Sequence, residues 1–440
     1  MKGGKAMYQV VYGPGFSGGS VVMPPSKSAA HRALLCAGLS GGRCLLSNMA
    51  VSEDIAATME ALKALGCAVG HNPSAKTMLV EKTSPCPKEG EIHCRESGGL
   101  LRFIIPIAAA LGGRWRFTGS GRLPQRPLGV YGDLLPAHGV SFVTEGGLPL
   151  EIEGQLAPGL FELPGDISSQ FVTGLLFALP LLPGDSEIRL TSPLESVGYV
   201  DMTLAVLQDF GVKTEKTAQG WRVPGRQQYL PRDYHVEGDW SQAAFFLNMA
   251  ALSPQGAQVR IGGLSPHSLQ GDMACVEVFG SFGLHTHWEE GWLIAQNLHP
   301  EKPFGGLTGQ TVDMAQITDM APALSVCAAL SGGETRLVNA GRLRLKESDR
   351  LAAMEEAVSA LGGRAKAEED ALIIQGVQRL AGGIAQGHND HRVLMALAGA
   401  GLRSSAPVQV TDAWAVRKTY PDFYEDFRKL GGSAHVVQLG

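Results

Sequence analysis

Six short clusters of polar residues each stand directly before an apolar stretch of the chain. They combine Ser, Asp, Lys, Arg and His side chains, which include strong partners for a bound anion. The clusters are S-K-S-A-A-H-R (26–32), E-S-G-G-L-L-R (96–102), D-I-S-S-Q (166–170), G-D-W-S-Q (238–242), D-M-A-Q-I-T-D (313–319) and H-N-D-H-R (388–392). A helix that starts at such a cluster offers free N–H groups and a partial positive charge, so each cluster is a candidate anion site.

A second interpretation makes these residues simple helix caps. Ser and Asp are good caps, and for Ser168 or Asp239 taken singly the cap is the favoured interpretation. Lys27 and Arg32 differ, because two cations at a helix start oppose the helix dipole. That pair indicates a bound anion.

Further charged groups stand before a second set of expected helices. They are Arg122 and Arg126 in R-L-P-Q-R-P (122–127), Lys346, Glu347, Asp349 and Arg350 in R-L-R-L-K-E-S-D-R (342–350), and Lys418 in R-K-T-Y-P-D-F (417–423). Ion pairs on an exposed helix could explain 342–350, since Lys346 and Arg350 would lie one turn apart. Charged residues are only 18% of the chain, against about 25% in typical proteins, which favours a binding role instead.

The elements that must position these residues recur along the chain. A helical apolar segment, a glycine and a short strand appear six times, at intervals of 69 to 79 residues. The glycines suit the left-handed conformation that ends a helix. They are Gly66, Gly139, Gly211, Gly283, Gly362 and Gly431.

A second series of apolar segments lies out of phase with these glycines. The segments are apolar on all sides, which predicts buried helices, and a strand such as E-T-R-L-V (334–338) follows each. They span 33–42, 105–113, 176–185, 245–254, 323–333 and 393–402. We therefore expect six α/β units of two helices and several strands, arranged as two globules of three units, with an ordinary doubly wound α/β protein as the alternative.

Composition excludes several classes of protein. With 44% apolar residues the chain is not disordered, and a net charge of −5 leaves no positive excess for nucleic acid. The longest apolar run, 171–182, is too short to span a bilayer, and M-K-G-G-K-A-M-Y lacks the apolar stretch of a signal peptide. Seven cysteines without a C-x-x-C pair indicate a reducing compartment, so we expect a cytoplasmic enzyme.

Several catalytic motifs are absent from the sequence. There is no Walker nucleotide motif and no G-x-S-x-G elbow. His285 and His287 alternate on an expected strand without a third ligand nearby. We expect neither a metal nor a cofactor.

The chain resembles the 5-enolpyruvylshikimate-3-phosphate synthase family in six motifs. They are P-S-K-S-A-A-H-R, R-L-P-Q-R-P, S-S-Q, K-E-S-D-R, N-D-H-R and K-T-Y-P, which occur in the family's order between about residues 20 and 425. Any one is weak, whereas six in order are specific. The sister family, UDP-N-acetylglucosamine enolpyruvyl transferase, shares the fold but lacks the S-K-S and N-D-H-R signatures.

The resemblance implies two inside-out α/β barrel domains of three repeated units each. One domain would comprise residues 25–240 and carry most of the shikimate 3-phosphate site. The other would comprise residues 1–24 and 241–440 and carry the carboxylates that transfer protons. The implied reaction joins phosphoenolpyruvate to the 5-hydroxyl of shikimate 3-phosphate by addition and elimination, through a tetrahedral intermediate and without a metal.

The resemblance also assigns roles to individual residues. Asp319, as proton acceptor, Glu347, as proton donor, and Lys27 are the catalytic residues, although which carboxylate protonates the methylene carbon stays open. The residues implied to contact phosphoenolpyruvate are Lys27, Gly98, Arg126, Gln170, Arg350, Arg392 and Lys418. The residues implied to contact shikimate 3-phosphate are Lys27, Ser28, Arg32, Ser168, Ser169, Gln170, Ser196, Asp319 and Lys346.

One segment departs from the family pattern. The family usually has Thr after the glycine in N-[A/S]-G-T, but in this chain Gly99 follows Gly98, and Glu96 adds an acidic side chain near an anion site. We therefore expect an altered response to glyphosate, the family's phosphoenolpyruvate-site inhibitor, with activity retained.

Two alternative functions remain at this point. One is an enolpyruvyl-type transferase with another acceptor, against which Ser168, Ser169 and Gln170 argue. The other is a non-catalytic anion-binding derivative, against which Asp319 and Glu347 argue. We expect a monomer whose partners are its small-molecule substrates, with neither nucleic acid nor a membrane.

Overall fold

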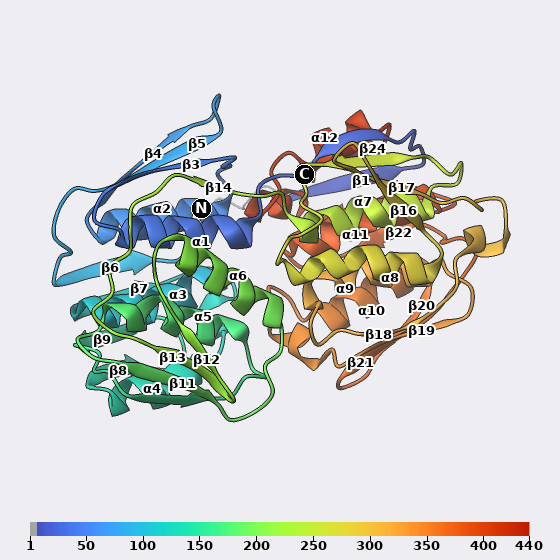
Figure 1. Ribbon diagram of the computed structural model, residues 1–440. Helices are drawn as coiled ribbons and strands as arrows, with labels where there is room; N and C mark the ends of the chain where they lie inside the picture. The colour runs from blue at the N-terminus through green and yellow to red at the C-terminus, as the bar shows by residue number, and fades with distance from the viewer. Residues whose placement is uncertain (1–6, 440) are drawn as a thin grey trace, which may run out of the picture. The chain divides into compact units, whose positions relative to one another are not determined.

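The computed structural model describes residues 7–439, which divide into two compact units. Of the described residues, unit 1 comprises 7–24 and 238–439, and unit 2 comprises 25–237 (Figure 1). The division falls at residues 237/238, against the expected 240/241. Residues 1–6, which hold most of the segment used to judge the signal peptide, and residue 440 lie outside the described part.

Six four-stranded sheets, three in each unit, share one pairing pattern. In every sheet one edge strand pairs with its neighbour in parallel, and the other two pairings are antiparallel. This shared pattern confirms the six repeated units predicted from the glycines.

Each unit holds three of these sheets, whose strands follow in the order of their hydrogen-bonded neighbours. Those of unit 2 are β14 (Tyr234–His235), β3 (Arg43–Ser47), β5 (Thr77–Lys82), β4 (Cys67–Asn72); β6 (Glu89–His93), β7 (Gly113–Thr118), β9 (Leu150–Gly154), β8 (Val140–Thr144); and β10 (Leu160–Leu163), β11 (Ser186–Leu190), β13 (Gly220–Val223), β12 (Glu215–Thr217). Those of unit 1 are β2 (Gly19–Val22), β15 (Val259–Gly262), β17 (Trp292–Gln296), β16 (His285–Glu289); β18 (Thr311–Asp313), β19 (Glu334–Val338), β21 (Ala371–Gln375), β20 (Arg364–Ala367); and β22 (Gly383–Ala385), β23 (Val408–Thr411), β1 (Met7–Gly13), β24 (Ser433–Leu439).

Each unit contains three almost fully buried helices. They are α1 (Lys27–Leu39), α3 (Gly98–Leu111) and α5 (Ser169–Ala178) in unit 2, and α7 (Trp240–Leu252), α9 (Ala321–Ala329) and α11 (His391–Leu402) in unit 1. A second series alternates with them: α2 (Glu53–Ala64), α4 (Gly129–Ala137), α6 (Val197–Asp209), α8 (Cys275–Phe282), α10 (Arg350–Ala360) and α12 (Phe423–Lys429). Short 3-10 segments include η5 (Thr318–Met320), η6 (Gly341–Leu345) and η7 (Ala413–Lys418).

The six glycines predicted to stop helices all have positive φ. Their φ angles lie between 80° and 117°, in the region that glycine enters without a steric penalty. Each follows the end of α2, α4, α6, α8, α10 or α12 within a few residues. The predicted helix stops are therefore confirmed.

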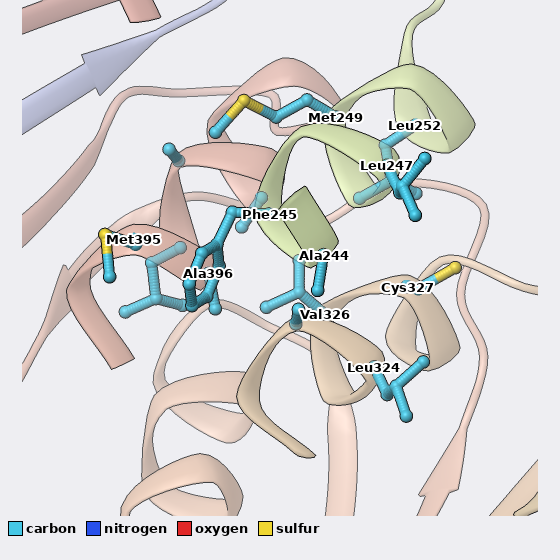
Figure 2. Close-up of a cluster of buried hydrophobic side chains, with 14 of the residues drawn as sticks. Ala244, Phe245, Leu247, Met249, Leu252, Leu324, Val326, Cys327, Met395 and Ala396 are labelled. Carbon is cyan, nitrogen blue, oxygen red and sulfur yellow. The ribbon is translucent and has the colours of Figure 1, made fainter. Parts of the chain in front are cut away.

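The core of unit 1 is built where α7, α9 and α11 pack against one another (Figure 2). Figure 2 shows Phe245 and Leu247 of α7, Leu324 and Val326 of α9, and Met395 of α11 within one apolar cluster. All five side chains are at most 1% exposed. Because these helices are largely apolar on every side, most of their polar groups lie at their ends, with Asn248 of α7 and Ser325 of α9 as buried exceptions.

Polar residues cap the starts of the buried helices. Ser26, Ser97 and Ser168 accept hydrogen bonds from backbone N–H groups of α1, α3 and α5. Asp239 and Asp390 do the same for α7 and α11. The capping interpretation of Ser168 and Asp239 is thus confirmed. The buried helices begin at or just after the six polar clusters, and α4, α10 and α12 begin at or just after the charged segments 122–127, 342–350 and 417–423.

The two ends of the chain meet in one sheet of unit 1. β1 lies between β23 and β24, with Gln9 opposite Thr411 on one side and Val437 on the other. The sixth repeat is therefore completed by the first strand of the chain. Within residues 7–439, no helix is long and apolar enough to cross a membrane.

Candidate active site

The first cluster of unit 2 lies at the start of α1. Lys27 forms an ion pair with Asp54 of α2, with 2.9 Å between Nζ and Oδ2. Arg32 donates from Nε to Thr203 Oγ1 (2.8 Å), from Nη1 to the Ser28 carbonyl (2.7 Å) and from Nη2 to the Tyr199 carbonyl (2.8 Å). Burial lowers the pKa of Arg32 to about 10, which leaves it charged at neutral pH.

These contacts give Lys27 and Arg32, the two cations that indicate a bound anion in the sequence, partners within the protein. Asp54 supplies the negative charge beside Lys27, and Arg32 is satisfied by oxygens of α1 and α6. A bound anion is therefore not needed to explain the two cations, and their roles as ligands rest on the family resemblance.

The second cluster of unit 2 joins the starts of α3 and α5. Gly98 lies against Arg126, because a Cβ atom added to Gly98 would lie 2.1 Å from Arg126 Nη1. Arg102, one turn further along α3, donates from Nη1 to Gln170 Oε1 (2.7 Å). Gly98, Arg126 and Gln170, three predicted contacts of phosphoenolpyruvate, therefore lie in one neighbourhood.

The predicted serines of unit 2 lie at helix starts. Ser28 is the second residue of α1, and Ser168 and Ser169 are the cap and first residue of α5. Ser196 precedes α6 with φ of 56°, a left-handed backbone that a non-glycine residue seldom adopts. Ten other non-glycine residues of the described part also have positive φ, so the backbone conformation by itself assigns no role to Ser196.

The centre of the unit 1 cluster is the carboxylate of Asp319. It accepts hydrogen bonds from Arg350 Nη1 (2.9 Å), Arg392 Nη2 (2.9 Å) and Lys346 Nζ (3.3 Å). Burial alone would raise its pKa, but Arg392, Lys346 and Arg350 outweigh burial and hold the pKa of Asp319 well below its ordinary value. Asp319 is therefore ionised at neutral pH.

Glu347 shares one of these cations with Asp319. Its Oε2 accepts a hydrogen bond from Arg350 Nη2 at 2.8 Å, and its side chain is 21% exposed. Burial lowers the pKa of the neighbouring Lys346, in spite of the opposite effect of Asp319. The two predicted proton-transfer groups thus lie on either side of the Arg350 guanidinium.

Residues 346–349 connect η6 to α10 and are not helical. Arg350, the first residue of α10, is 1% exposed. The alternative of an exposed charged helix at 342–350 is therefore wrong, because the segment turns inward to bring Lys346 and Arg350 to Asp319.

The starts of the three buried helices of unit 1 meet at Arg392. Its Nη2 donates to Ser241 Oγ (3.0 Å), next to the start of α7, and to Asp319 Oδ2, before α9. Arg392 itself is the second residue of α11. Lys418, at the end of η7, donates to the Asn389 carbonyl beside the same helix start (2.6 Å).

Several residues that organise these clusters have contacts that the sequence does not indicate. Asp54, which lies outside the polar segments, pairs with Lys27. Arg102 donates to Gln170, Arg392 donates to Ser241, and Arg350 and Ser348 both donate to Asp390. Arg102, Ser241 and Asp390 lie in the polar segments, but each contacts a residue that is 40 to 151 positions away in the sequence. No spacing rule indicates such pairs.

No group of three or more His, Cys, Asp or Glu side chains in the described part of the chain is arranged to hold a metal ion. The polar clusters of the two units instead combine cations, hydroxyls and an amide with the carboxylates of Asp54, Asp319, Glu347 and Asp390. This set of groups can bind phosphate and carboxylate anions and can move protons.

The fold has close relatives among solved structures. The enolpyruvyl transferase NikO from Streptomyces tendae superposes with a TM-score of 0.79 at 17% identity, over 99% of this chain and 100% of that one. EPSP synthase from Acinetobacter baumannii gives a TM-score of 0.76 at 24% identity, over 99% and 100%. The architecture is therefore that of the enolpyruvyl transferases, the two-domain inside-out α/β fold.

Sequence similarity narrows the class to one family. The family model for EPSP synthase (3-phosphoshikimate 1-carboxyvinyltransferase) matches residues 12–427. Proteins named 3-phosphoshikimate 1-carboxyvinyltransferase from Clostridium kluyveri and Clostridioides difficile are 42% and 41% identical, each over 96% of this chain and 97% of the relative. The chain belongs to the EPSP synthase family.

Proposed function

We propose that the polar clusters of unit 1 and unit 2 bind the substrates and carry the chemistry of this family's reaction. The chain is an enzyme of the shikimate pathway, which leads to the aromatic amino acids. It transfers the enolpyruvyl group of phosphoenolpyruvate to the 5-hydroxyl of shikimate 3-phosphate and releases phosphate. What remains to be assigned is the role of each residue.

In the addition step, the 5-hydroxyl oxygen forms a bond to C2 of phosphoenolpyruvate. The hydroxyl proton passes to a base, and C3 receives a proton from an acid. In the elimination step, C3 loses a proton and the bond from C2 to the phosphate oxygen breaks, which restores the double bond. The reaction therefore needs one group that accepts a proton, one that donates a proton, and cations that hold two phosphates and a carboxylate.

The observation that carries the assignment is the triple contact of Asp319 with Arg350, Arg392 and Lys346. Because these cations keep Asp319 ionised, it has no proton to donate at neutral pH and is assigned as the group that accepts the hydroxyl proton. Glu347, on the other side of Arg350, is then the proton donor. The family resemblance makes Lys27 the third catalytic group, and as a cation it is suited to bind the phosphoenolpyruvate anion.

The remaining predicted residues bind the two substrates in this proposal. Arginine suits the carboxylate and the phosphate groups because its planar guanidinium presents paired donors. The phosphoenolpyruvate site comprises Lys27, Gly98, Arg126, Gln170, Arg350, Arg392 and Lys418. The shikimate 3-phosphate site comprises Lys27, Ser28, Arg32, Ser168, Ser169, Gln170, Ser196, Asp319 and Lys346.

We also propose that the enzyme is a cytoplasmic monomer. Its seven cysteines are unpaired and six of them are buried, as expected for a protein of a reducing compartment. Light scattering on a size-exclusion column would test the monomer, and a mass of twice 46.5 kDa would contradict it.

The function is tested by phosphate release from purified protein. Phosphoenolpyruvate and shikimate 3-phosphate are supplied together and singly, and release is expected only with both. If both substrates bind but no phosphate appears, the acceptor differs or the protein is an anion-binding derivative. Release with phosphoenolpyruvate alone would point to a phosphatase and would also contradict the transfer.

A further inference from the structure

Arg102 lies in the second cluster of unit 2, where the starts of α3 and α5 meet, although it is not among the residues predicted to contact phosphoenolpyruvate. It is one turn after Gly98 on α3 and only 7% exposed. Its Nη2 donates to the Pro127 carbonyl (3.3 Å), next to Arg126, and its Cζ lies 4.9 Å from the centre of the Phe171 ring on α5. The guanidinium is therefore directed at protein groups on the two segments that neighbour α3.

The contact with Gln170 has a chemical consequence. A glutamine amide has one end that accepts hydrogen bonds and one that donates them. Arg102 Nη1 donates to Gln170 Oε1 at 2.7 Å, and the reversed amide would set its NH2 group against the N–H of a cation. The Nε2 group is thus directed away from Arg102 with its two protons available as donors.

The Nε2 group lies at the start of α3. It is 3.6 Å from the position that a Cβ atom on Gly99 would occupy. Gly98 and Gly99 are the first two residues of that helix, where backbone N–H groups favour an anion. Gly99 has no side chain, so no side-chain atom at position 99 restricts rotation of the Gln170 amide. The contact with Arg102 therefore fixes its orientation.

We propose that Arg102 is a positioning residue that holds Gln170 as an obligate hydrogen-bond donor to the phosphoenolpyruvate anion. This inference rests on the proposed role of Gln170 as a contact of phosphoenolpyruvate. Arg102 acts only through Gln170 and does not touch the substrate. A neutral or shorter residue at position 102 would let the amide rotate and present its oxygen to the anion.

A merely structural role for Arg102 makes a different prediction. α3 and α5 are held together independently of the guanidinium, because Tyr131 Oη contacts the carbonyls of Arg102 (2.7 Å) and Phe171 (3.0 Å). Phe103 and Phe177 also pack edge to face across the two helices. Loss of the guanidinium should therefore leave the helices in place and change the function of Gln170.

A double-mutant cycle tests the proposal. The variants are Arg102→Met, Gln170→Ala and the double variant, and the measured quantity is KM for phosphoenolpyruvate at saturating shikimate 3-phosphate, well below the Tm of each protein. Each single change is expected to raise KM about tenfold, the usual effect of a hydrogen bond to a charged group. The double variant should match Gln170→Ala within about twofold, because Arg102 has nothing left to position. Independent effects, with KM raised about 100-fold in the double variant, would overturn the proposal.

A second variant addresses the case in which Arg102→Met does not fold. Gln170→Glu keeps an acceptor for Arg102, in a stronger charge-assisted pair, but has no donor for the anion. Its KM for phosphoenolpyruvate should rise more than that of Gln170→Ala, and the KM of Arg102→Lys should lie between those of the wild type and Gln170→Ala. If Gln170→Glu binds phosphoenolpyruvate within about twofold of the wild type, the proposal is wrong.

Failure of the proposal is distinguishable from failure of the proposed site. If Gln170→Ala leaves KM unchanged, Gln170 does not contact phosphoenolpyruvate, and the inference about Arg102 falls with that assignment. Phosphate release by the wild type that still requires both substrates would show that the function stands. A raised KM in Gln170→Ala with an unchanged KM in Arg102→Met would overturn only the positioning role.

Discussion

Asp390 accepts a hydrogen bond from Arg350 Nε at 2.9 Å, and the two side chains are 0% and 1% exposed. The same carboxylate caps α11 through the Arg392 backbone N–H and accepts from Ser348 Oγ. Arg350 in turn contacts both proposed proton-transfer groups, Asp319 and Glu347. One buried acid therefore supports the guanidinium around which the carboxylates are arranged.

Removing this acid should reduce both stability and substrate binding. In Asp390→Ala, Arg350 keeps its buried charge and loses a partner, which costs about 3–5 kcal/mol of unfolding free energy. Denaturant unfolding measures the loss, and KM for phosphoenolpyruvate should rise because Arg350 is released. Asp349→Ala is the matched control, since Asp349 caps the neighbouring α10 and its side chain is 35% exposed, so about 1 kcal/mol is expected. Equal losses in the two variants would contradict the special position of Asp390.

Asp319→Asn should abolish turnover while binding persists. A missing proton acceptor lowers kcat by about 100-fold or more. Affinity for phosphoenolpyruvate should not fall, because Arg350, Arg392 and Lys346 lose a competing anion; calorimetry measures it. Asp313→Asn is the control, since Asp313 is exposed at the end of β18 and should retain wild-type kcat. Wild-type turnover in Asp319→Asn would refute the acceptor role.

Adjacent glycines on α3 should respond differently to the same substitution. In Gly98→Ala the new Cβ would lie 2.1 Å from Arg126 Nη1, so the guanidinium must move and KM for phosphoenolpyruvate should rise. In Gly99→Ala the nearest atom is 3.6 Å away, an ordinary contact, and KM should change by less than about twofold. Steady-state kinetics of both variants would settle this, and equal KM values would show that Arg126 adapts freely.

The glycine at position 99 should also affect inhibition by glyphosate. Gly99→Thr restores the residue usual in the family and places a β-branched side chain beside Gln170 Nε2. We expect the half-inhibitory concentration of glyphosate to shift while kcat is retained. Superimposable inhibition curves for the wild type and Gly99→Thr would show that the glycine has no influence on the inhibitor.

Stability should decrease as the pH falls from 7 to 4 because of His31. Burial lowers the pKa of His31 to about 4, against 6.5 in an unfolded chain, so the unfolded state binds the extra proton first. The stabilisation is complete above about pH 6.5 and is lost as the pH falls towards 4, by about 1.4 kcal/mol for each unit of pKa difference. Urea unfolding of His31→Gln should show a flatter pH dependence in this window, because glutamine does not titrate. Gln can keep the hydrogen bond to Thr58, so the fold should tolerate the change. His285→Gln, which removes an exposed histidine, should behave as the wild type.

A second decrease in folding stability is expected at lower pH. Arg350 and His391, against the opposing effect of burial, lower the pKa of Asp390 to about 2. Because this folded-state pKa lies below the unfolded one, its contribution is present above about pH 4 and is lost between pH 4 and 2. Asp390→Ala should show a smaller second step, because Asp319, whose pKa is also lowered, still contributes to it.

The repeats and the fold could be predicted from local features. Gly66 and its five counterparts need only the local geometry of a helix end, and all have positive φ. The apolar stretches marked the interiors of the buried helices but not their starts. α1 begins at Lys27 and α3 at Gly98, six and seven residues before the stretches at 33 and 105, because their first turns are polar or glycine-rich.

The partners within the site could not be predicted in the same way. Lys27 indicates a bound anion in the sequence because the sequence does not show that Asp54, 27 residues later, lies beside it. The contact between Arg102 and Gln170 spans 68 residues, and that between Ser241 and Arg392 spans 151. Such pairs depend on how helices pack, which the hydrophobic pattern of a single helix does not specify.

The position of β1 between β23 and β24 sets an order of events during synthesis on the ribosome. All twelve strands of unit 2 lie between residues 43 and 235, so its three sheets can be completed while the rest of the chain is still being translated. The first strand of unit 1 must wait for partners at 408–411 and 433–439. Unit 1 therefore finishes folding only when the last residues have emerged, and a nascent chain stalled near residue 400 would hold a complete unit 2 beside an open unit 1.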